Sequence, residues 1–471
     1  MIECTIAEGF QTSGCHIIVI LKEGYENSLS VFLGEERPLL FEADFNEVYI
    51  LEKDRTQFFL LGLGTKSSVE AIREAAIGFS VKYGKQLPED KISLHLPDSF
   101  DSSRLLAFYS GFFLGGYSLK GVKAHFLNRK NSELRVKPED GKLATDALIL
   151  AKAQITCMDW LNKPANKKNG LLIADFAKEM AARYNLGCTV FNREASATNG
   201  LDAYLSVNRG SEHDAAFIIL EYKPEKASRK IGLVGKCVTF DTGGISIKPS
   251  QNLHYMKSDM GGATAVLGAF QAIAEMKLPV HAIGILPATD NAVSDRAYLP
   301  SDVINSHAGK TIEVIDTDAE GRLTLADGLS FLIKNYNPEV VIDLATLTGS
   351  AVRTFGYECA ALFTKNKNLH NALSKAGELS GEKVWQLPMW ESYAENLQSD
   401  IADIKNYSGK PIAGAIDAAI FLENFTHEHK AWAHLDIAGV AFGNTHFGKD
   451  KTATGYGVHL LLEYIKGIIN E

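Results

Sequence analysis

The sequence Ile231-Gly-Leu-Val-Gly-Lys-Cys-Val-Thr-Phe-Asp-Thr-Gly-Gly244 runs from a short apolar segment directly into charged and glycine-rich positions. Apolar segments without polar alternation are typical of strands that are buried on both faces of a parallel sheet. Two more, Val280–Leu286 and Val340–Leu344, follow in the same part of the chain. Because ligand sites gather at the carboxyl ends of parallel strands, we predict a mostly parallel central sheet with its reactive groups at that edge.

The rest of the chain extends this α/β pattern toward the amino end. Strand-like runs such as Phe58–Leu61 alternate there with helical stretches such as Val69–Tyr83, and a further helix is expected at Leu143–Leu161. A polar, Pro- and Gly-punctuated stretch follows that helix and is typical of a connection between domains. We therefore predict a smaller amino-terminal α/β domain with an oligomer or regulatory role, a linker helix with its connection, and a larger catalytic α/β domain, at residues 1–150, 151–169 and 170–471.

Composition excludes several classes of function. With 48 Lys and Arg against 57 Asp and Glu, the net charge is −9, which argues against nucleic-acid binding through a basic surface. No basic, apolar signal segment opens the chain, and no apolar run reaches the ~18 residues of a membrane-spanning helix. The six cysteines form no C-x-x-C pair and are typical of reduced thiols. We expect a cytoplasmic protein with no membrane and no nucleic-acid partner.

Four carboxylates follow strands or precede helices in the larger domain: Asp241, Asp259, Asp318 and Glu320. Any one of them, taken alone, is more often a helix cap or a solvated side chain. If all four converge, they repel one another unless cations neutralise them. Two divalent metal ions ~3.5–4 Å apart, sharing a bridging carboxylate, would do so and would supply a bridging hydroxide for hydrolysis.

The segment around Asp318 resembles a known signature. Asp316-Thr-Asp-Ala-Glu-Gly-Arg-Leu323 matches seven of the eight positions of an octapeptide of the leucyl aminopeptidase family, the dimetal cytosol aminopeptidases, which has Asn in the first position. The block from Val234 to Gly262 and the segment Trp432–Gly439 are also similar to that family in order and spacing. The resemblance covers essentially residues 160–471 and is faint over the first 150.

The resemblance implies two divalent metal ions per subunit, zinc or manganese. It places one ion on Asp241, Asp318 and Glu320. It places the other on Lys236, Asp241, Asp259 and Glu320. Lys248 and Arg322 are implied as catalytic residues outside the metal shell, with a bicarbonate ion on the arginine as general base. An apolar substrate pocket is implied at Met256, Thr346, Leu347, Ala438 and Ala441.

The implied function is a metal-dependent aminopeptidase that releases Leu or other apolar residues from the amino end of peptides by a metal-bridging hydroxide. The family assembly implies a homohexamer of two trimers. From the residues alone, a salt bridge between Lys236 and a carboxylate is favoured, whereas the resemblance favours a metal ligand. Four departures from the family pattern, Cys237, Thr242, Asp316 and Asp417, remove none of the ligand positions. A metal-free scaffold and a DNA-binding regulator are alternatives, against which the ligand set and the acidic charge argue.

Overall fold

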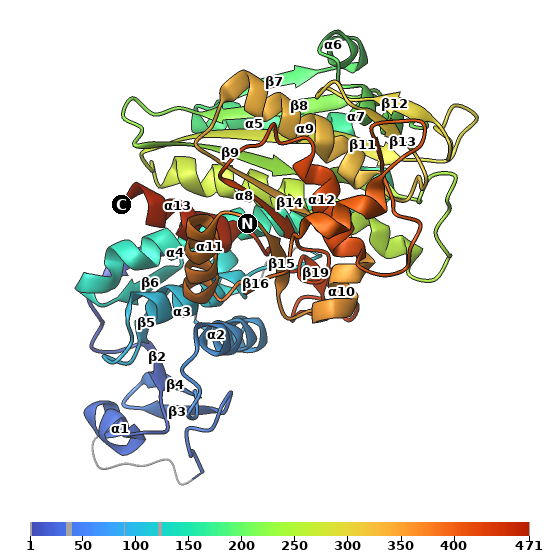
Figure 1. The fold of residues 1–471 in the computed structure, drawn as a ribbon. Coiled ribbons are helices and arrows are strands. Elements are labelled where there is room, and N and C mark those ends of the chain that lie inside the picture. Colours follow the sequence, from blue (N-terminus) through green and yellow to red (C-terminus); the bar gives the residue numbers. More distant parts are fainter. Residues whose placement is uncertain (1, 34–39, 89, 121–124, 471) are drawn as a thin grey trace. The chain divides into compact units, whose positions relative to one another are not determined.

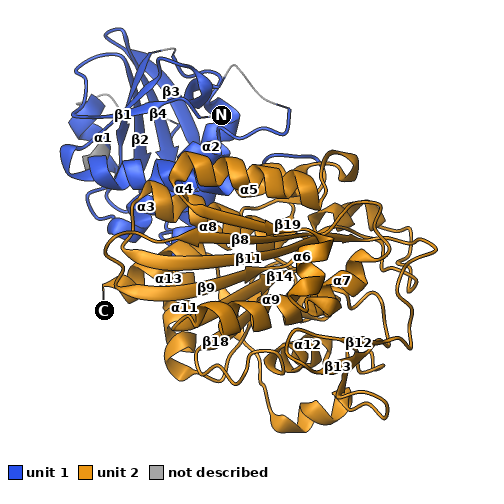
Figure 2. Cartoon of the chain, turned by 90° about the horizontal axis from the view of Figure 1, so that it is seen from above, with its two compact units in different colours: residues 1–155, 379–381, 446–449 blue, residues 156–378, 382–445, 450–471 orange. Residues whose placement is uncertain are grey.

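The protein is described by a computed structural model that covers residues 2–33, 40–88, 90–120 and 125–470. The chain divides into two compact units, shown in different colours in Figure 2. Unit 1 comprises residues 1–155, 379–381 and 446–449, and unit 2 comprises residues 156–378, 382–445 and 450–471. Both units are α/β, as predicted. The domain boundaries expected from the sequence, at 1–150, 151–169 and 170–471, stay predictions.

Unit 1 contains a six-stranded sheet in the order β1-β6-β5-β2-β4-β3. The strands are β1 (Thr5–Glu8), β2 (Cys15–Ile20), β3 (Val48–Lys53), β4 (Thr56–Gly62), β5 (Lys91–His95) and β6 (Glu133–Val136). All neighbouring strands are parallel except β3 and β4. The helices are α1 (Tyr25–Leu33), α2 (Val69–Tyr83) and α3 (Ser102–Leu114). Helix α2 has the predicted bounds because the Ser68 side chain accepts a hydrogen bond from the Ala71 N–H and so fixes its start.

Unit 2 is built on a nine-stranded sheet, in the order β16-β15-β18-β14-β9-β11-β8-β7, with β10 paired to β11. Figure 1 labels most of these strands, among them the central β9, β11 and β14. Its strands are β7 (Gly187–Phe191), β8 (Ala216–Tyr222), β9 (Arg229–Gly235), β10 (Cys237–Asp241), β11 (Val280–Asn291), β14 (Val340–Ala345), β15 (Ala360–Phe363), β16 (Val384–Gln386) and β18 (Trp432–Asp436). The central strands β18, β14, β9 and β11 run parallel to one another. The predicted mostly parallel sheet is therefore confirmed, with antiparallel pairs toward its edges.

Two helices cover opposite faces of this sheet, α8 (Gly261–Glu275) and α9 (Gly321–Tyr336). Side chains of a strand alternate between its two faces. On β9, a Cβ at Gly235 would lie 2.6 Å from the Ala263 Cα of α8, and a Cβ at Gly232 would lie 2.5 Å from the Leu332 side chain of α9. Both helices therefore approach β9 closely, and at Gly235, where the neighbouring atoms are backbone atoms of α8, only glycine fits. Each helix begins at the carboxyl end of the central strands, which brings the residues at its start to the same edge.

Unit 2 contains further helices and two small sheets. Helix α4 (Gly141–Asn162) enters the unit, and α5 (Gly170–Tyr184), α6 (Arg193–Thr198), α7 (Asp202–Asn208), the 3₁₀ segment η4 (Leu253–Ser258), α10 (Gly349–Phe355), α11 (Lys367–Ser380), α12 (Gly414–Glu423) and α13 (Val458–Ile469) follow. Two small sheets pair β12 (Val303–Asn305) with β13 (Thr311–Glu313) and β17 (Ile404–Lys405), and β19 (Phe442–Gly443) with β20 (Thr452–Ala453). Among the helices that the structure describes, none is long and apolar enough to cross a membrane.

Candidate active site

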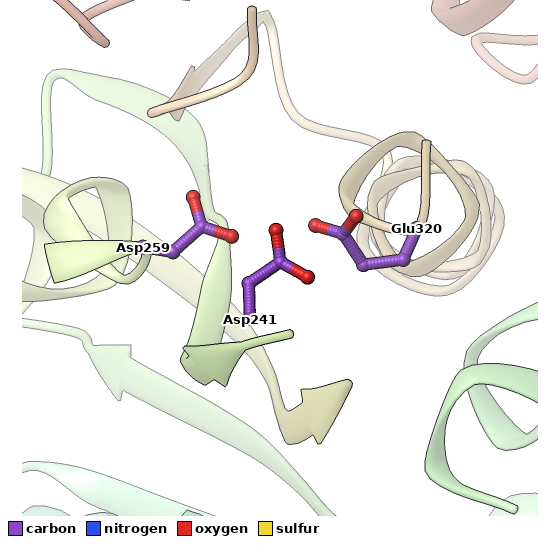
Figure 3. A group of neighbouring side chains, drawn as sticks. All are labelled: Asp241, Asp259 and Glu320. Atoms are coloured by element: carbon purple, nitrogen blue, oxygen red, sulfur yellow. The ribbon is translucent and has the colours of Figure 1, made fainter. Parts of the chain in front are cut away.

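The predicted carboxylates meet at the carboxyl edge of the unit 2 sheet. Asp241 is the last residue of β10, Asp259 lies between η4 and α8, and Glu320 directly precedes α9. One carboxylate oxygen from each of the three lies within 4.8 Å of the other two, and all three residues are buried. Figure 3 shows the three carboxylates turned toward one another from three separate elements. The convergence expected from strand ends is thus present in the fold.

Two lysines enter this cluster from different segments. Lys236, directly after β9, places its Nζ 2.7 Å from Asp259 Oδ2 and 2.9 Å from Glu320 Oε1. Lys248, in the loop after β10, places its Nζ 2.8 Å from Asp241 Oδ2 and also contacts Asp318 Oδ1. Four carboxylates therefore share two ammonium groups. If all are ionised, the cluster keeps an excess of two negative charges.

The pKa values of the cluster reflect this excess. Burial raises the pKa of Asp318 to about 7, repulsion from Asp241 and Glu320 adds to the rise, and Lys248 opposes it. Burial likewise raises the pKa of Asp259. For Lys236 burial alone would lower the pKa, but attraction to the surrounding carboxylates outweighs it and raises the pKa. The carboxylates attract the lysine ammonium groups strongly, and the negative charge that remains favours the binding of further cations.

The carboxylate oxygens have acceptor capacity left for a metal ion. Among the residues that the structure describes, Asp259 Oδ2, Asp318 Oδ1 and both oxygens of Glu320 accept no hydrogen bond. Three of these four oxygens contact a lysine ammonium group: Asp259 Oδ2 and Glu320 Oε1 contact Lys236, and Asp318 Oδ1 contacts Lys248. Buried carboxylates without hydrogen-bond partners are unfavourable unless a cation binds them. Carboxylate oxygens that lie this close together are suited to binding divalent metal ions.

Neighbouring groups hold the carboxylates in place, and the sequence did not single out most of them. Asn291 Nδ2 and the Gly243 N–H both donate to Asp241 Oδ1 at 2.9 Å. Thr346 Oγ1 donates to Asp259 Oδ1 at 2.8 Å, and the Thr346 carbonyl accepts from Lys236 Nζ at 3.1 Å. Thr346, predicted only as a pocket residue, therefore also orients the proposed ligands. Asn291 is the last residue of β11 and follows the polar pair Thr289 and Asp290, so no apolar pattern marked it as part of a buried strand.

Arg322 lies in the first turn of α9 and is buried. Its Nη1 donates to the Asn406 carbonyl at 2.7 Å, while its Nε has no hydrogen-bond partner among the described residues. Burial lowers the pKa of the guanidinium, and nearby carboxylates oppose that shift. Asn406, fully buried after the two-residue strand β17, also donates to the Asp316 carbonyl at 2.7 Å. Through these two hydrogen bonds, Asn406 links Arg322 to the loop that carries Asp318.

A cavity of about 540 Å³ opens above the cluster. Its lining includes Lys236, Asp241, Lys248, Asp259, Asp318 and Arg322. Four of the five predicted pocket residues also line it, namely Met256, Thr346, Leu347 and Ala438. Ala441 is outside the lining; it is buried, and its Cβ lies 2.9 Å from where a Cβ on Gly261 would be. Glu320 is buried beneath the cavity floor. The fold brings these side chains together, and their individual roles stay predictions.

These observations define an α/β protein with a buried carboxylate and lysine cluster suited to divalent metal ions, at the floor of a cavity large enough for a short peptide. Comparison with known proteins gives the class. Residues 155–462 match the model of the cytosol aminopeptidase family, catalytic domain. A probable cytosol aminopeptidase of Chlorobaculum tepidum is 47% identical over 469 residues, covering 91% of this chain and 90% of that protein. One of Chlorobium limicola is 40% identical over 457 residues, covering 90% of each.

Solved structures agree with the sequence relatives. The bottromycin maturation enzyme BotP in complex with Mn superimposes with a TM-score of 0.86 at 30% identity, covering 97% of this chain and 100% of that one. The chain belongs to the cytosol aminopeptidase family. It is a hydrolase that acts on peptides as a metal-dependent aminopeptidase, and its cofactor is a divalent metal ion. The resemblance found in the sequence is confirmed.

Proposed function

We propose that the protein releases single apolar residues, preferentially Leu, from the free amino end of peptides, using two divalent ions per subunit. The observation that carries this proposal is the convergence of Asp241, Asp259 and Glu320 with open oxygen atoms, beside Asp318 and Lys236. We assign one ion to Asp241, Asp318 and Glu320. We assign the other to Lys236, Asp241, Asp259 and Glu320. Zinc and manganese are the proposed metals.

The bound ions would supply an activated water and a Lewis acid for the scissile carbonyl. The chain's own residues then carry the other tasks. Lys248, with its Nζ in the cavity wall, would stabilise the negative charge that develops on the carbonyl oxygen. Arg322 would hold a bicarbonate ion that takes up the proton, since its unpartnered Nε is free to donate and a guanidinium suits a planar anion.

Preference for an apolar amino-terminal residue follows from the pocket. Met256, Leu347 and Ala438 present apolar surface to the cavity beside Asp259, where the substrate's amino group would bind. A buried Leu side chain gains roughly 1.5–3 kcal/mol from leaving water, whereas an Asp or Glu side chain would lose its hydration there. Leu and Met are therefore the expected residues at the cleaved end.

The deciding experiment compares a free and a blocked amino end. Leu-Gly-Gly and acetyl-Leu-Gly-Gly are incubated with enzyme loaded separately with zinc, manganese or cobalt, and release is followed by mass spectrometry. We expect stepwise release from the free peptide and none from the acetylated one, because the amide has no lone pair to bind a metal. Cleavage of the blocked peptide, or internal fragments, would rule out the exopeptidase assignment.

Two further properties are proposed from family membership. The hexamer of two trimers implied by the family is proposed for this chain, to be checked by light scattering of the purified protein. Its relatives' name, cytosol aminopeptidase, supports a cytoplasmic location.

A further inference from the structure

Two basic side chains line the active-site cavity without an acidic partner. Arg353 of α10 and Lys410, in the loop before α12, are both exposed and both contribute to the lining. Among the residues that the structure describes, neither forms an ion pair. Lys410 Nζ donates only to a neutral group, Asn396 Oδ1, at 2.7 Å. Their positive charges are therefore available to something that enters the cavity.

These two residues belong to the same wall. Arg353 Nη1 lies 3.5 Å from the position of a Cβ on Gly349, so the guanidinium folds back along α10 toward the start of that helix. The segment that carries Lys410 lies against the same helix, because a Cβ on Gly414 would be 3.3 Å from Ser350 Cβ. Gly349, Ser350 and Gly414 all line the cavity. The wall is thus continuous from the start of α10 to the start of α12.

The charged residues of the cavity form two groups: the carboxylates and lysines of the metal cluster, here called the floor, and the basic residues Arg353 and Lys410, here called the wall. The floor carboxylates are paired with Lys236 and Lys248 and still keep an excess of negative charge. Among the described residues, the wall formed by Arg353 and Lys410 contains no carboxylate paired with either cation, and it includes polar groups such as Tyr407. A peptide carries one negative group that could compensate it, a carboxylate. Guanidinium and ammonium groups are both strong carboxylate donors.

We propose that Arg353 and Lys410 bind a carboxylate of the peptide substrate while its amino end lies over the floor. This inference rests on the proposed function, because it takes the floor to be the place of the scissile bond. The carboxylate can come from the free carboxyl end of a di- or tripeptide or from an Asp or Glu side chain. In either case the wall adds a preference for a negative charge to the preference of the pocket for an apolar residue. Short peptides with a free carboxyl end, or peptides with an acidic residue, are then cleaved faster than their uncharged counterparts.

The experiment uses matched peptides that differ in one charge. Leu-Gly-Gly is compared with its carboxamide, and the carboxamide Leu-Glu-Gly-NH₂ with Leu-Gln-Gly-NH₂ and Glu-Gly-Gly-NH₂ with Gln-Gly-Gly-NH₂. Exposed ion pairs change affinity up to about fivefold each, so the two cations together should give a preference of ~5–10-fold in kcat/KM, carried by KM. The preference should shrink in 0.5 M NaCl, because salt screens exposed charges.

Three variants make the test specific. Arg353→Met with Lys410→Met should abolish the preference by lowering kcat/KM for the charged peptides to that of their uncharged partners, and circular dichroism with thermal unfolding shows that the variant is folded. Lys375→Met, an exposed lysine that lines a different cavity, should leave the preference unchanged. Preference in the first peptide pair identifies the carboxyl end, and preference in either Glu/Gln pair identifies a side chain.

Equal rates within all three pairs, or a preference that survives in the double variant, would overturn the carboxylate site and leave the aminopeptidase assignment intact. Failure of the wild type to cleave any of these peptides would instead overturn the proposed function, and the carboxylate site with it.

Discussion

Two buried lysines of unit 2 differ in their partners. Lys236 is 3% exposed and lies between two carboxylates, those of Asp259 and Glu320. Lys168 is 4% exposed. Within the described part of the chain, its Nζ donates only to backbone carbonyls, those of Trp160 at 3.1 Å, Leu161 at 3.1 Å and Lys257 at 2.5 Å. Burial is the same for both, so any difference between them comes from the partners.

The partners decide the charge of each amine. Three carbonyls satisfy the hydrogen bonds of Lys168 but bring no formal negative charge, so burial lowers its pKa to about 7, and repulsion by Lys257 adds to this shift. The carboxylates around Lys236 overcome the same burial and raise its pKa. Hydrogen bonding alone therefore does not keep a buried lysine charged; an opposite charge does.

The two sites consequently serve different purposes. Lys168 joins the end of α4 to η4, and Lys257 donates in return to the Asn162 carbonyl at 3.2 Å. Because η4 carries Met256 and leads directly into Asp259, this pair of lysines fixes the backbone from which the cavity is built. Lys236 contacts the carboxylates themselves. If Lys236 is to bind a metal as a neutral amine, the metal must displace the proton of that amine. The surrounding carboxylates hold this proton more tightly than water would.

The largest expected effect separates the proposed metal-ligand role of Lys236 from the structural role of Lys168. Lys236→Met, like Glu320→Ala, should reduce activity by more than the ~10²–10⁴-fold of a single acid–base or oxyanion group, and should lower bound metal, because each removes a proposed ligand. Lys168→Met should keep its metal and lose less than about tenfold. Metal analysis and kcat/KM of the three purified variants provide the measurement. Full metal and activity in Lys236→Met would leave Lys236 as a salt bridge only.

A second effect distinguishes Lys248 and Arg322 from the metal ligands. Lys248→Ala and Arg322→Ala should each lower kcat by ~10²–10⁴-fold with nearly normal metal content, because they are expected to act on the oxyanion and on the proton transfer. The same two assays suffice. Complete loss of metal in either variant would place that residue in the ligand shell instead.

The sequence predicted the parts of the site that follow strands. Asp241, Asp259 and Glu320 could be located because each is next to an apolar strand or a helix start, and such positions converge in a parallel sheet. Asn406 could not, because it becomes buried only through β17, a two-residue strand whose partner β13 lies some 90 residues earlier in the chain. Lys168 was hidden in a polar stretch that is typical of a connection, since its burial depends on carbonyls of α4 and η4.

The smallest expected effect tests the lowered pKa of Lys168 through stability. In the unfolded chain this lysine titrates near its ordinary pKa of 10.5, and in the folded protein near about 7. Below pH 7 both states carry the proton, and the full penalty for burying the charge is present. Between pH 7 and 10.5 the unfolded state binds more protons than the folded state. The free energy of unfolding contributed by this residue therefore rises with pH, by at most about 1.4 kcal/mol per pH unit.

Lys168→Met has no such group, so the difference in unfolding free energy between wild type and variant should change with pH. From pH 6.5 to 9.5 the wild type should gain about 2–4 kcal/mol relative to the variant, measured by urea unfolding of both proteins at matched metal concentration. The control Lys375→Met, at an exposed lysine, shows how much of any change comes from the removal of a surface lysine. If the difference in unfolding free energy between wild type and Lys168→Met stays constant with pH, three carbonyl dipoles are enough to keep a buried lysine protonated. The contrast with Lys236 would then rest on geometry and not on charge.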